Sequence, residues 1–309
     1  AYILGGSKSG AYRTDKLSEL DGYRYYNVWS SVGSVQNYCY FAKYILENAN
    51  PKKIIINLSG GETRKFDRQH VSDMCVIPAQ VTGDSVFLEN LEFLFKDVHV
   101  AMDVLKKRKK EDPKNSYDNS HTGERTLTKY YRSRAKDPLK FVTKNVLMNY
   151  DKQLKQLFTG RLSNNGYREI LEAIREVKAL CEEKGVEFML MLAPTFIAEM
   201  SEHDCEAYWE YMEELAVITD YWDFSGYNDV NLNPYNFYND GHFLYEITDL
   251  VVDTITGADS YEGFGTYVTL ENVYSHVQER KEKYLALQKE YLETGTVKLQ
   301  EYTDPSNIV

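Results

Sequence analysis

The sequence predicts an α/β domain on a doubly wound, mainly parallel, five-stranded sheet, with a helical insertion and a helical C-terminal tail. Short apolar runs alternate with longer segments of helical periodicity, as in parallel sheets joined by crossover helices. One run, "VEFMLMLAP", is apolar almost throughout, as expected of a strand buried between two helix layers. The 309 residues, 43% of them hydrophobic and 27% charged, suffice to bury one large core.

Five segments are predicted as strands, namely residues 1–6, 23–30, 51–60, 186–194 and 219–226. Four more are predicted as helices, at residues 34–49, 164–184, 244–255 and within 270–300. The first two helices place apolar residues at i, i+3 and i+4, and the last is amphipathic and rich in Glu and Lys. Gly185 suits the position that follows a helix and leads into the next strand.

Residues 1–260 are predicted to form the domain and residues 261–309 a helical extension. Residues 62–165 interrupt the alternation and are predicted to be a largely helical insertion with a mobile middle. The insertion contains the charge run "KKRKKEDPKNS" at residues 106–116. Such a run usually forms a solvated helix face, and the alternative is a surface for an anionic polymer or a membrane.

Composition excludes several classes of function. The net charge of −11 argues against a nucleic-acid partner, which needs a concentrated basic face. No run of about 18 apolar residues is present, so no membrane-spanning helix is expected. The phosphate-loop spacing and the common metal-ligand spacings of Cys and His are absent, so neither a cofactor nor a metal is expected.

The cysteines and the first residues of the sequence bear on the cellular compartment of the protein. Four scattered cysteines, Cys39, Cys75, Cys181 and Cys205, leave both free thiols and two disulfides open. The sequence starts at Ala1, already inside a predicted strand, and we expect a signal or a membrane anchor to precede it.

Three segments fall at the carboxyl edge of the predicted sheet, where doubly wound sheets bind their ligands. They are "GGSKSG", "SSVGS" and "NFYNDGHF", after the first, second and fifth strands. Ser7 is the candidate nucleophile, because Gly5 and Gly6 permit a tight turn before it, and His242 is the candidate base. Each signal alone is more typical of a turn or a solvated loop. Together, at one edge of one sheet, they favour a catalytic site, with oxyanion donors from the backbone N–H groups of Ser7 and Gly33.

The same segments resemble the SGNH (GDSL-type) hydrolase superfamily. "ILGGSKSG" resembles the block that carries the nucleophile, here Ser7, and "YNVWSSVGS" the block whose glycine, here Gly33, donates to the oxyanion. The segment ending in "NFYNDGHFLYEITDLVVDTI" is similar to the last block, whose histidine is here His242. The similarity covers residues 1–60 and 165–255, misses most of the insertion, and implies an SGNH or flavodoxin-like fold.

Two positions depart from the family pattern. The last block usually reads Asp-x-x-His, but here Asn239 stands three residues before His242 and Asp240 two before it. We predict Asp240 as the orienting acid, with Asn239 as its rival, which accepts from the imidazole but supplies no charge. The family's third block offers an oxyanion asparagine, for which the candidate here is Asn57 in "INLSGGE". Asn57 sits inside a strand run, so its role stays open.

Among SGNH proteins the chain looks most like those that accompany membrane acyltransferases, such as the D-alanyl-transfer protein of teichoic acid pathways and the alginate and cellulose O-acetylation proteins. The resemblance implies a membrane-anchored, extracellular enzyme that transfers or hydrolyses acyl esters, of O-acetyl or D-alanyl type. It implies a cell-surface polysaccharide or teichoic acid as substrate and a membrane-bound O-acyltransferase as partner.

Three alternatives stay open. Simple deacetylation fits the same fold and the same residues. A non-catalytic scaffold that binds polymer or a membrane partner is favoured by Asn239. A small-ligand-binding flavodoxin-like domain would need a phosphate-binding loop, which the sequence lacks.

Overall fold

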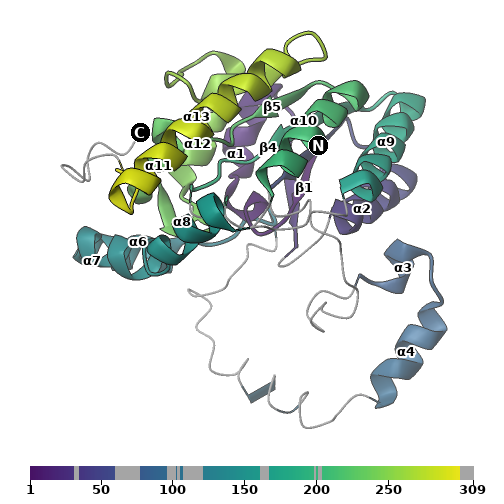
Figure 1. Cartoon of the computed structure of the whole chain (residues 1–309). Helices are drawn as coiled ribbons and strands as arrows, with labels where there is room; N and C mark the ends of the chain where they lie inside the picture. The colour runs from purple at the N-terminus through teal and green to yellow at the C-terminus, as the bar shows by residue number, and fades with distance from the viewer. Residues whose placement is uncertain are drawn as a thin grey trace.

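The computed structural model of the chain describes residues 1–30, 35–59, 77–95, 102, 105–106, 121–160, 167–197, 200 and 204–299. Within these residues the chain forms an α/β fold on a six-stranded sheet (Figure 1). The strands of the sheet are β1 (Tyr2–Gly5), β2 (Tyr26–Trp29), β3 (Lys53–Leu58), β4 (Glu187–Leu192), β5 (Tyr221–Asp223) and β8 (Thr266–Val268). A separate hairpin joins β6 (Phe237–Asn239) to β7 (His242–Phe243).

The strand order is β2-β1-β3-β4-β5-β8, and every neighbouring pair is parallel except β5 and β8. The first five strands lie inside the five ranges predicted from sequence, so the mainly parallel α/β class is confirmed. The sixth strand, β8, was not predicted, because this short antiparallel strand stands outside the alternation of parallel strands and crossover helices on which the prediction rests. The carboxyl ends of β1 to β5 share one edge of the sheet, which doubly wound folds use for binding.

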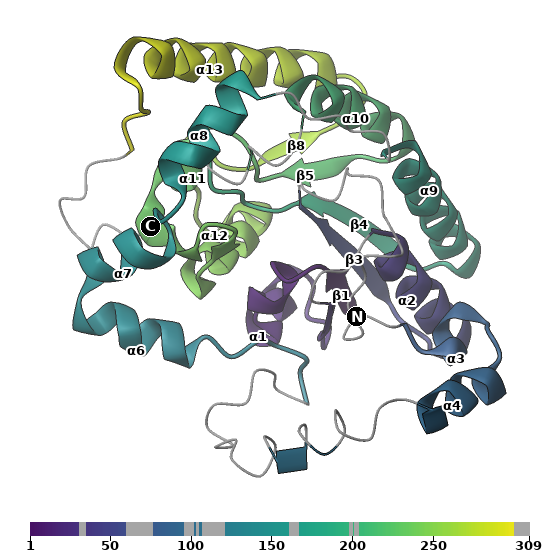
Figure 2. The same ribbon diagram turned by 60° about the horizontal axis from the view of Figure 1, so that its bottom comes forward.

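Helices cover both faces of the sheet. The described helices are α1 (Thr14–Leu17), α2 (Val35–Asn48), α3 (Ala79–Thr82), α4 (Val86–Phe95), α6 (Thr128–Lys136), α7 (Pro138–Asn145), α8 (Tyr150–Thr159), α9 (Tyr167–Lys184), α10 (Cys205–Ile218), α11 (Asp229–Leu232), α12 (Tyr245–Thr256) and α13 (Val273–Thr294). Figure 2 shows α2, α9 and α10 along one face and α1 and α12 along the other. This double cover explains why all six residues of β3 are buried.

The described parts of the predicted insertion are mostly helical, from α3 to α8. Its middle, predicted to be mobile, and nearly all of the charge run lie outside the described residues. The part that resumes at residue 121 runs beside the edge strand β2, where the Asn27 N–H donates to the Thr122 carbonyl at 2.8 Å. None of the helices described here combines the length and the apolar composition that a membrane crossing requires.

The C-terminal segment, predicted as an extension beyond residue 260, is integrated with the domain. It supplies β8 to the sheet, and α13 packs beside α10 (Figure 2). Arg280 of α13 is buried, and its Nη1 donates to Asp223 Oδ2 at the carboxyl end of β5 over 2.7 Å. The tail therefore closes one end of the core.

Candidate functional site

Ser7 lies in a tight turn directly after β1. The Ser9 N–H donates to the Gly6 carbonyl at 2.9 Å, which leaves the N–H groups of Ser7 and Lys8 outside the turn's own hydrogen bond. Gly5 must be glycine, since a Cβ atom there would lie 2.0 Å from Ser9 Oγ. This close packing of β1 against the turn holds Ser7 at the carboxyl edge of the sheet.

The structure brings His242 to Ser7 across 235 positions of sequence. His242 Nε2 lies 2.5 Å from Ser7 Oγ, and both side chains are half-buried. This is the nucleophile-to-base contact that an activated serine requires. The two residues that were paired from sequence therefore meet at one edge of the sheet.

Asn239 contacts the other nitrogen of the imidazole. The hairpin register pairs Asn239 with His242, and side chains of directly opposed residues lie on one face, so Asn239 Oδ1 reaches His242 Nδ1 at 2.8 Å. The Gly241 N–H donates to the same Oδ1 at 3.0 Å, so the atom facing the ring is the amide oxygen and not the nitrogen. Nδ1 must then carry the proton, which leaves Nε2 free to accept from Ser7.

Asp240, predicted as the orienting acid, does not face the imidazole. It belongs to the two-residue connection between β6 and β7, outside the register that aligns Asn239 with His242. Its Oδ2 accepts a hydrogen bond from Gln153 Nε2 of α8 at 3.1 Å. The structure thus gives the contact with His242 to the rival residue, Asn239.

The other two predicted oxyanion residues have different outcomes. Asn57 is buried in β3, where its Nδ2 donates to Ser9 Oγ at 2.9 Å and its Oδ1 accepts from Tyr12 Oη at 3.5 Å. Its side chain therefore braces the turn through Ser9. Gly33 lies outside the described residues, in the gap 31–34.

Two cations beside the imidazole were not singled out from sequence. Lys8 is buried, and its Nζ donates to Thr195 Oγ1 at 3.0 Å beyond the end of β4. Arg125 comes from the insertion, and its Nη1 donates to Tyr238 Oη at 2.8 Å. Nothing in the local pattern marks Arg125, because its place depends on how a distant segment folds back.

These surroundings set the charge state of His242. Burial lowers the pKa of the imidazole, and the positive charges of Arg125 and Lys8 lower it further, to about 3. Asn239 brings no negative charge to offset them. His242 is therefore neutral near pH 7, which suits a proton acceptor, but the imidazolium that follows proton transfer is disfavoured.

Buried asparagines hold the loop that carries the hairpin. Asn231 Nδ2 donates to the carbonyls of Phe224 at 2.9 Å and Gly226 at 3.1 Å, and Asn236 Nδ2 donates to the Val230 carbonyl at 2.9 Å. These bonds satisfy backbone carbonyl groups of the loop and of the short helix α11. The asparagine-rich segment "NDVNLNPYN" thus fixes the position from which His242 reaches Ser7.

Other candidate chemistry finds little support in the described part of the chain. No three His, Cys, Asp or Glu side chains gather there in a way that could hold a metal ion. Cys39, Cys181 and Cys205 are free, whereas Cys75 lies outside the described ranges. Burial raises the pKa of Cys181 and Cys205 to about 11, which keeps both as poorly nucleophilic thiols.

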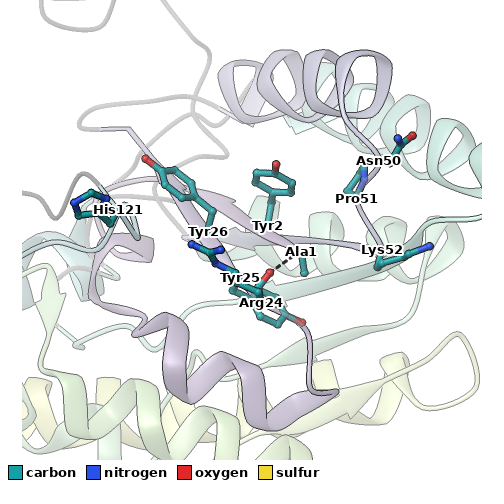
Figure 3. Close-up of a pocket in the computed structure, with 9 residues that line it drawn as sticks. All are labelled: Ala1, Tyr2, Arg24, Tyr25, Tyr26, Asn50, Pro51, Lys52 and His121. Atoms are coloured by element: carbon teal, nitrogen blue, oxygen red, sulfur yellow. Dashed lines mark hydrogen bonds between the residues drawn. The ribbon is translucent and has the colours of Figure 1, made fainter.

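A pocket of about 510 Å³ lies at the opposite edge of the sheet (Figure 3). Its lining includes Tyr2, Tyr26 and Lys52, at or just before the first residues of β1, β2 and β3. The length of β1, about 13 Å for four residues, separates this edge from the turn that holds Ser7. The pocket is therefore not part of the serine site.

No protein-family model matches the chain, and a search of curated proteins found no match either. A serine hydroxyl, a neutral imidazole with the right tautomer and an orienting amide carbonyl form a chain of hydrogen bonds at the carboxyl edge of the mainly parallel sheet. Such an arrangement can deprotonate Ser7 during attack on an acyl carbonyl.

Proposed function

We propose that the protein is a serine-dependent enzyme of SGNH type that transfers or hydrolyses acyl esters. The observation that carries the proposal is the continuous array from Ser7 Oγ through His242 to Asn239 Oδ1, with contacts of 2.5 and 2.8 Å. The substrate class, a cell-surface polysaccharide or teichoic acid, comes from the resemblance of the sequence blocks. The same resemblance supports a second part of the proposal, in which a membrane-bound acyltransferase delivers the acyl group.

The proposed reaction has two halves. Ser7 Oγ attacks the acyl carbonyl while His242 Nε2 takes its proton, and the N–H groups of the turn stabilise the oxyanion. His242 returns the proton to the departing alkoxide, which leaves an acyl ester on Ser7. Water or a sugar hydroxyl then gives its proton to His242 and attacks that ester, and the proton returns to Ser7 Oγ as the acyl group departs.

Covalent labelling tests the nucleophile directly. Phenylmethanesulfonyl fluoride should modify the wild-type protein once, at Ser7, as measured by intact-protein and peptide mass spectrometry. The Ser7→Ala variant should take no label. Ser18→Ala is the control, because Ser18 Oγ donates to the Thr14 carbonyl outside the turn; this variant should still be labelled at Ser7.

The role of Asn239 yields a second prediction. Asn239→Asp should raise the pKa of His242 by at least about one unit, since a carboxylate stabilises the imidazolium, and should raise kcat/KM for an activated acetyl ester about tenfold. An aspartate can still accept the Gly241 N–H, so the hairpin geometry is retained. NMR titration of the ring nitrogens and steady-state kinetics measure the two effects.

Asp240→Asn is the control for that prediction. It removes the neighbouring carboxylate, which accepts a hydrogen bond from Gln153, and should change kcat/KM by less than about threefold. A loss of a hundredfold or more in Asp240→Asn, with no gain in Asn239→Asp, would restore Asp240 as the orienting acid.

A non-catalytic scaffold is the second candidate function. It is favoured by the neutral Asn239 and by the lowered pKa of His242, because both weaken the base. A wild-type protein that takes no sulfonyl label and hydrolyses no activated ester would support this candidate over the enzyme.

A further inference from the structure

Both backbone polar groups of Arg125 form hydrogen bonds that hold this residue beside the serine site. Its own N–H donates to the Gly10 carbonyl at 2.8 Å, and its carbonyl accepts from Tyr245 Oη at 2.5 Å. Gly10 permits this approach, since a Cβ atom there would lie 3.0 Å from Arg125 Cβ and from the Trp29 ring. The insertion is thereby bound to the loop that follows Ser7.

The guanidinium of Arg125 lies over two aromatic rings. Its Cζ is 5.3 Å from the centroid of Trp29 and 5.5 Å from that of Tyr238, within the range of cation–π attraction. The Tyr238 ring in turn stacks on His242, with centroids 5.3 Å apart and planes 23° apart. Arg125 is half-buried, and its guanidinium reaches the aromatic ring that stacks on the imidazole.

The two cations near His242 differ in access. Lys8 is 5% exposed and its Nζ contacts Thr195 Oγ1 and the Pro194 carbonyl, so it supplies a fixed positive charge behind the turn. Arg125 is the less buried of the two cations. Burial lowers the pKa of the His242 imidazole, and the positive charges of Arg125 and Lys8 lower it further.

We propose that Arg125 binds an anionic group, a carboxylate or a phosphate, carried by the alcohol part of the ester next to the bond that breaks. The inference rests on the proposed acyl-ester chemistry and names its substrate class, an acidic acyl acceptor. A guanidinium suits this role because its planar donors match the geometry of carboxylate and phosphate oxygens. The aromatic rings of Trp29 and Tyr238 hold that plane in place.

Binding of an anion here would also serve the base. Its negative charge offsets Arg125 and Lys8, so the imidazolium of His242 becomes less costly, and the substrate supplies the charge that Asn239 lacks. The same field disfavours an acyl group with an ammonium beside the reacting carbonyl. An acetyl group therefore fits this site better than a D-alanyl group.

The test compares 4-acetoxybenzoate with its neutral analogue 4-acetoxybenzamide. The wild-type protein should show a kcat/KM about tenfold higher for the benzoate, as expected for a charge-assisted hydrogen bond in a half-buried site. Arg125→Gln should reduce that ratio to about one. Arg125→Lys keeps the charge but loses the planar donors that lie over Trp29 and Tyr238, so it should retain only part of the ratio. 4-Acetoxyphenyl phosphate distinguishes a phosphate from a carboxylate preference.

Arg24→Gln is the matched control, because it removes the same charge at the opposite edge of the sheet and should keep the wild-type ratio. A wild-type ratio of one or less, or an unchanged ratio in Arg125→Gln, overturns the inference. If Arg125→Gln lowers kcat/KM for the benzoate and for the benzamide by the same factor, Arg125 only positions Tyr238. That result also overturns the inference.

A binding measurement separates this inference from the proposed function. Binding to the Ser7→Ala variant is followed by titration of the NMR signal of the Trp29 indole N–H. The dissociation constant of 4-hydroxybenzoate should be at least about tenfold lower than that of 4-hydroxybenzamide, and the additional change Arg125→Gln should abolish the difference. Selective binding without hydrolysis by the wild type would refute the enzyme and leave the anion site standing. Hydrolysis without selective binding would refute the anion site alone.

Discussion

Replacing Ser7 with alanine is expected to lower kcat/KM for an activated acetyl ester at least about a thousandfold. The Ser7 hydroxyl is the group that His242 Nε2 contacts at 2.5 Å, and within the described part of the chain no other side chain forms a hydrogen bond with that nitrogen. His242→Ala should cause a loss of similar size, because the serine proton then has no acceptor. Steady-state kinetics on purified, folded variants measure both.

The double variant makes the test sharper. If Ser7 and His242 act as one unit, Ser7→Ala/His242→Ala should be no slower than either single variant, since the second change removes nothing that still works. Additive losses would mean that the two residues act independently. Retention of more than about a tenth of the wild-type rate in Ser7→Ala would exclude Ser7 as the nucleophile.

Replacing Arg280 with methionine is expected to lower the free energy of unfolding by about 3–5 kcal/mol, because it leaves a buried carboxylate without its ion-pair partner. Asp223 has no exposed side-chain surface and accepts from Arg280 Nη1 at 2.7 Å, from His276 Nε2 at 2.7 Å and from Ser225 Oγ at 2.6 Å. Urea denaturation at constant pH measures the loss.

Lys283→Met on the same helix is the control. Lys283 pairs with Glu279 at 2.7 Å on the surface, and its loss should cost less than about 1 kcal/mol. The double variant Asp223→Asn/Arg280→Met should be less destabilised than the sum of its single changes, since the two residues share one interaction. Equal effects of Arg280→Met and Lys283→Met would refute the anchoring role of Arg280.

Because Asp223 is ionised and buried beside Arg280, we expect the stability of the protein to depend on pH in the acid range. Burial by itself raises the pKa of Asp223, but the charge of Arg280 and the hydrogen bond from His276 outweigh burial and lower the pKa to about 2, from 3.8 in the unfolded chain. The stabilisation is present above pH 3.8 and is lost as the pH falls towards 2, because the unfolded state then binds the proton more readily. Arg280→Met should flatten this part of the profile.

The ion pair between Asp223 and Arg280 is also expected to affect the serine site. Asp223 ends β5, and the chain that follows leads through Asn231 and Asn236 to the hairpin that carries His242. Loosening of α13 should therefore weaken the contact with Ser7 as well as the fold.

The sequence by itself determined the α/β class, the first five strands and the pairing of Ser7 with His242. These features depend on local signals: apolar runs of strand length, helical periodicity that ends at a glycine such as Gly185, and loops at the carboxyl ends of strands. The parallel topology follows from the alternation of strands and helices. Such signals are read from neighbouring residues and need no knowledge of distant contacts.

Only the tertiary structure decided which residue orients His242 and which cation stands beside it. Asn239 and Asp240 are adjacent in sequence, and the register of the β6–β7 hairpin alone turns one towards the imidazole and the other towards Gln153. Arg125 and β8 are placed by pairing with segments far away in the chain, whose energies depend on packing that no local pattern encodes.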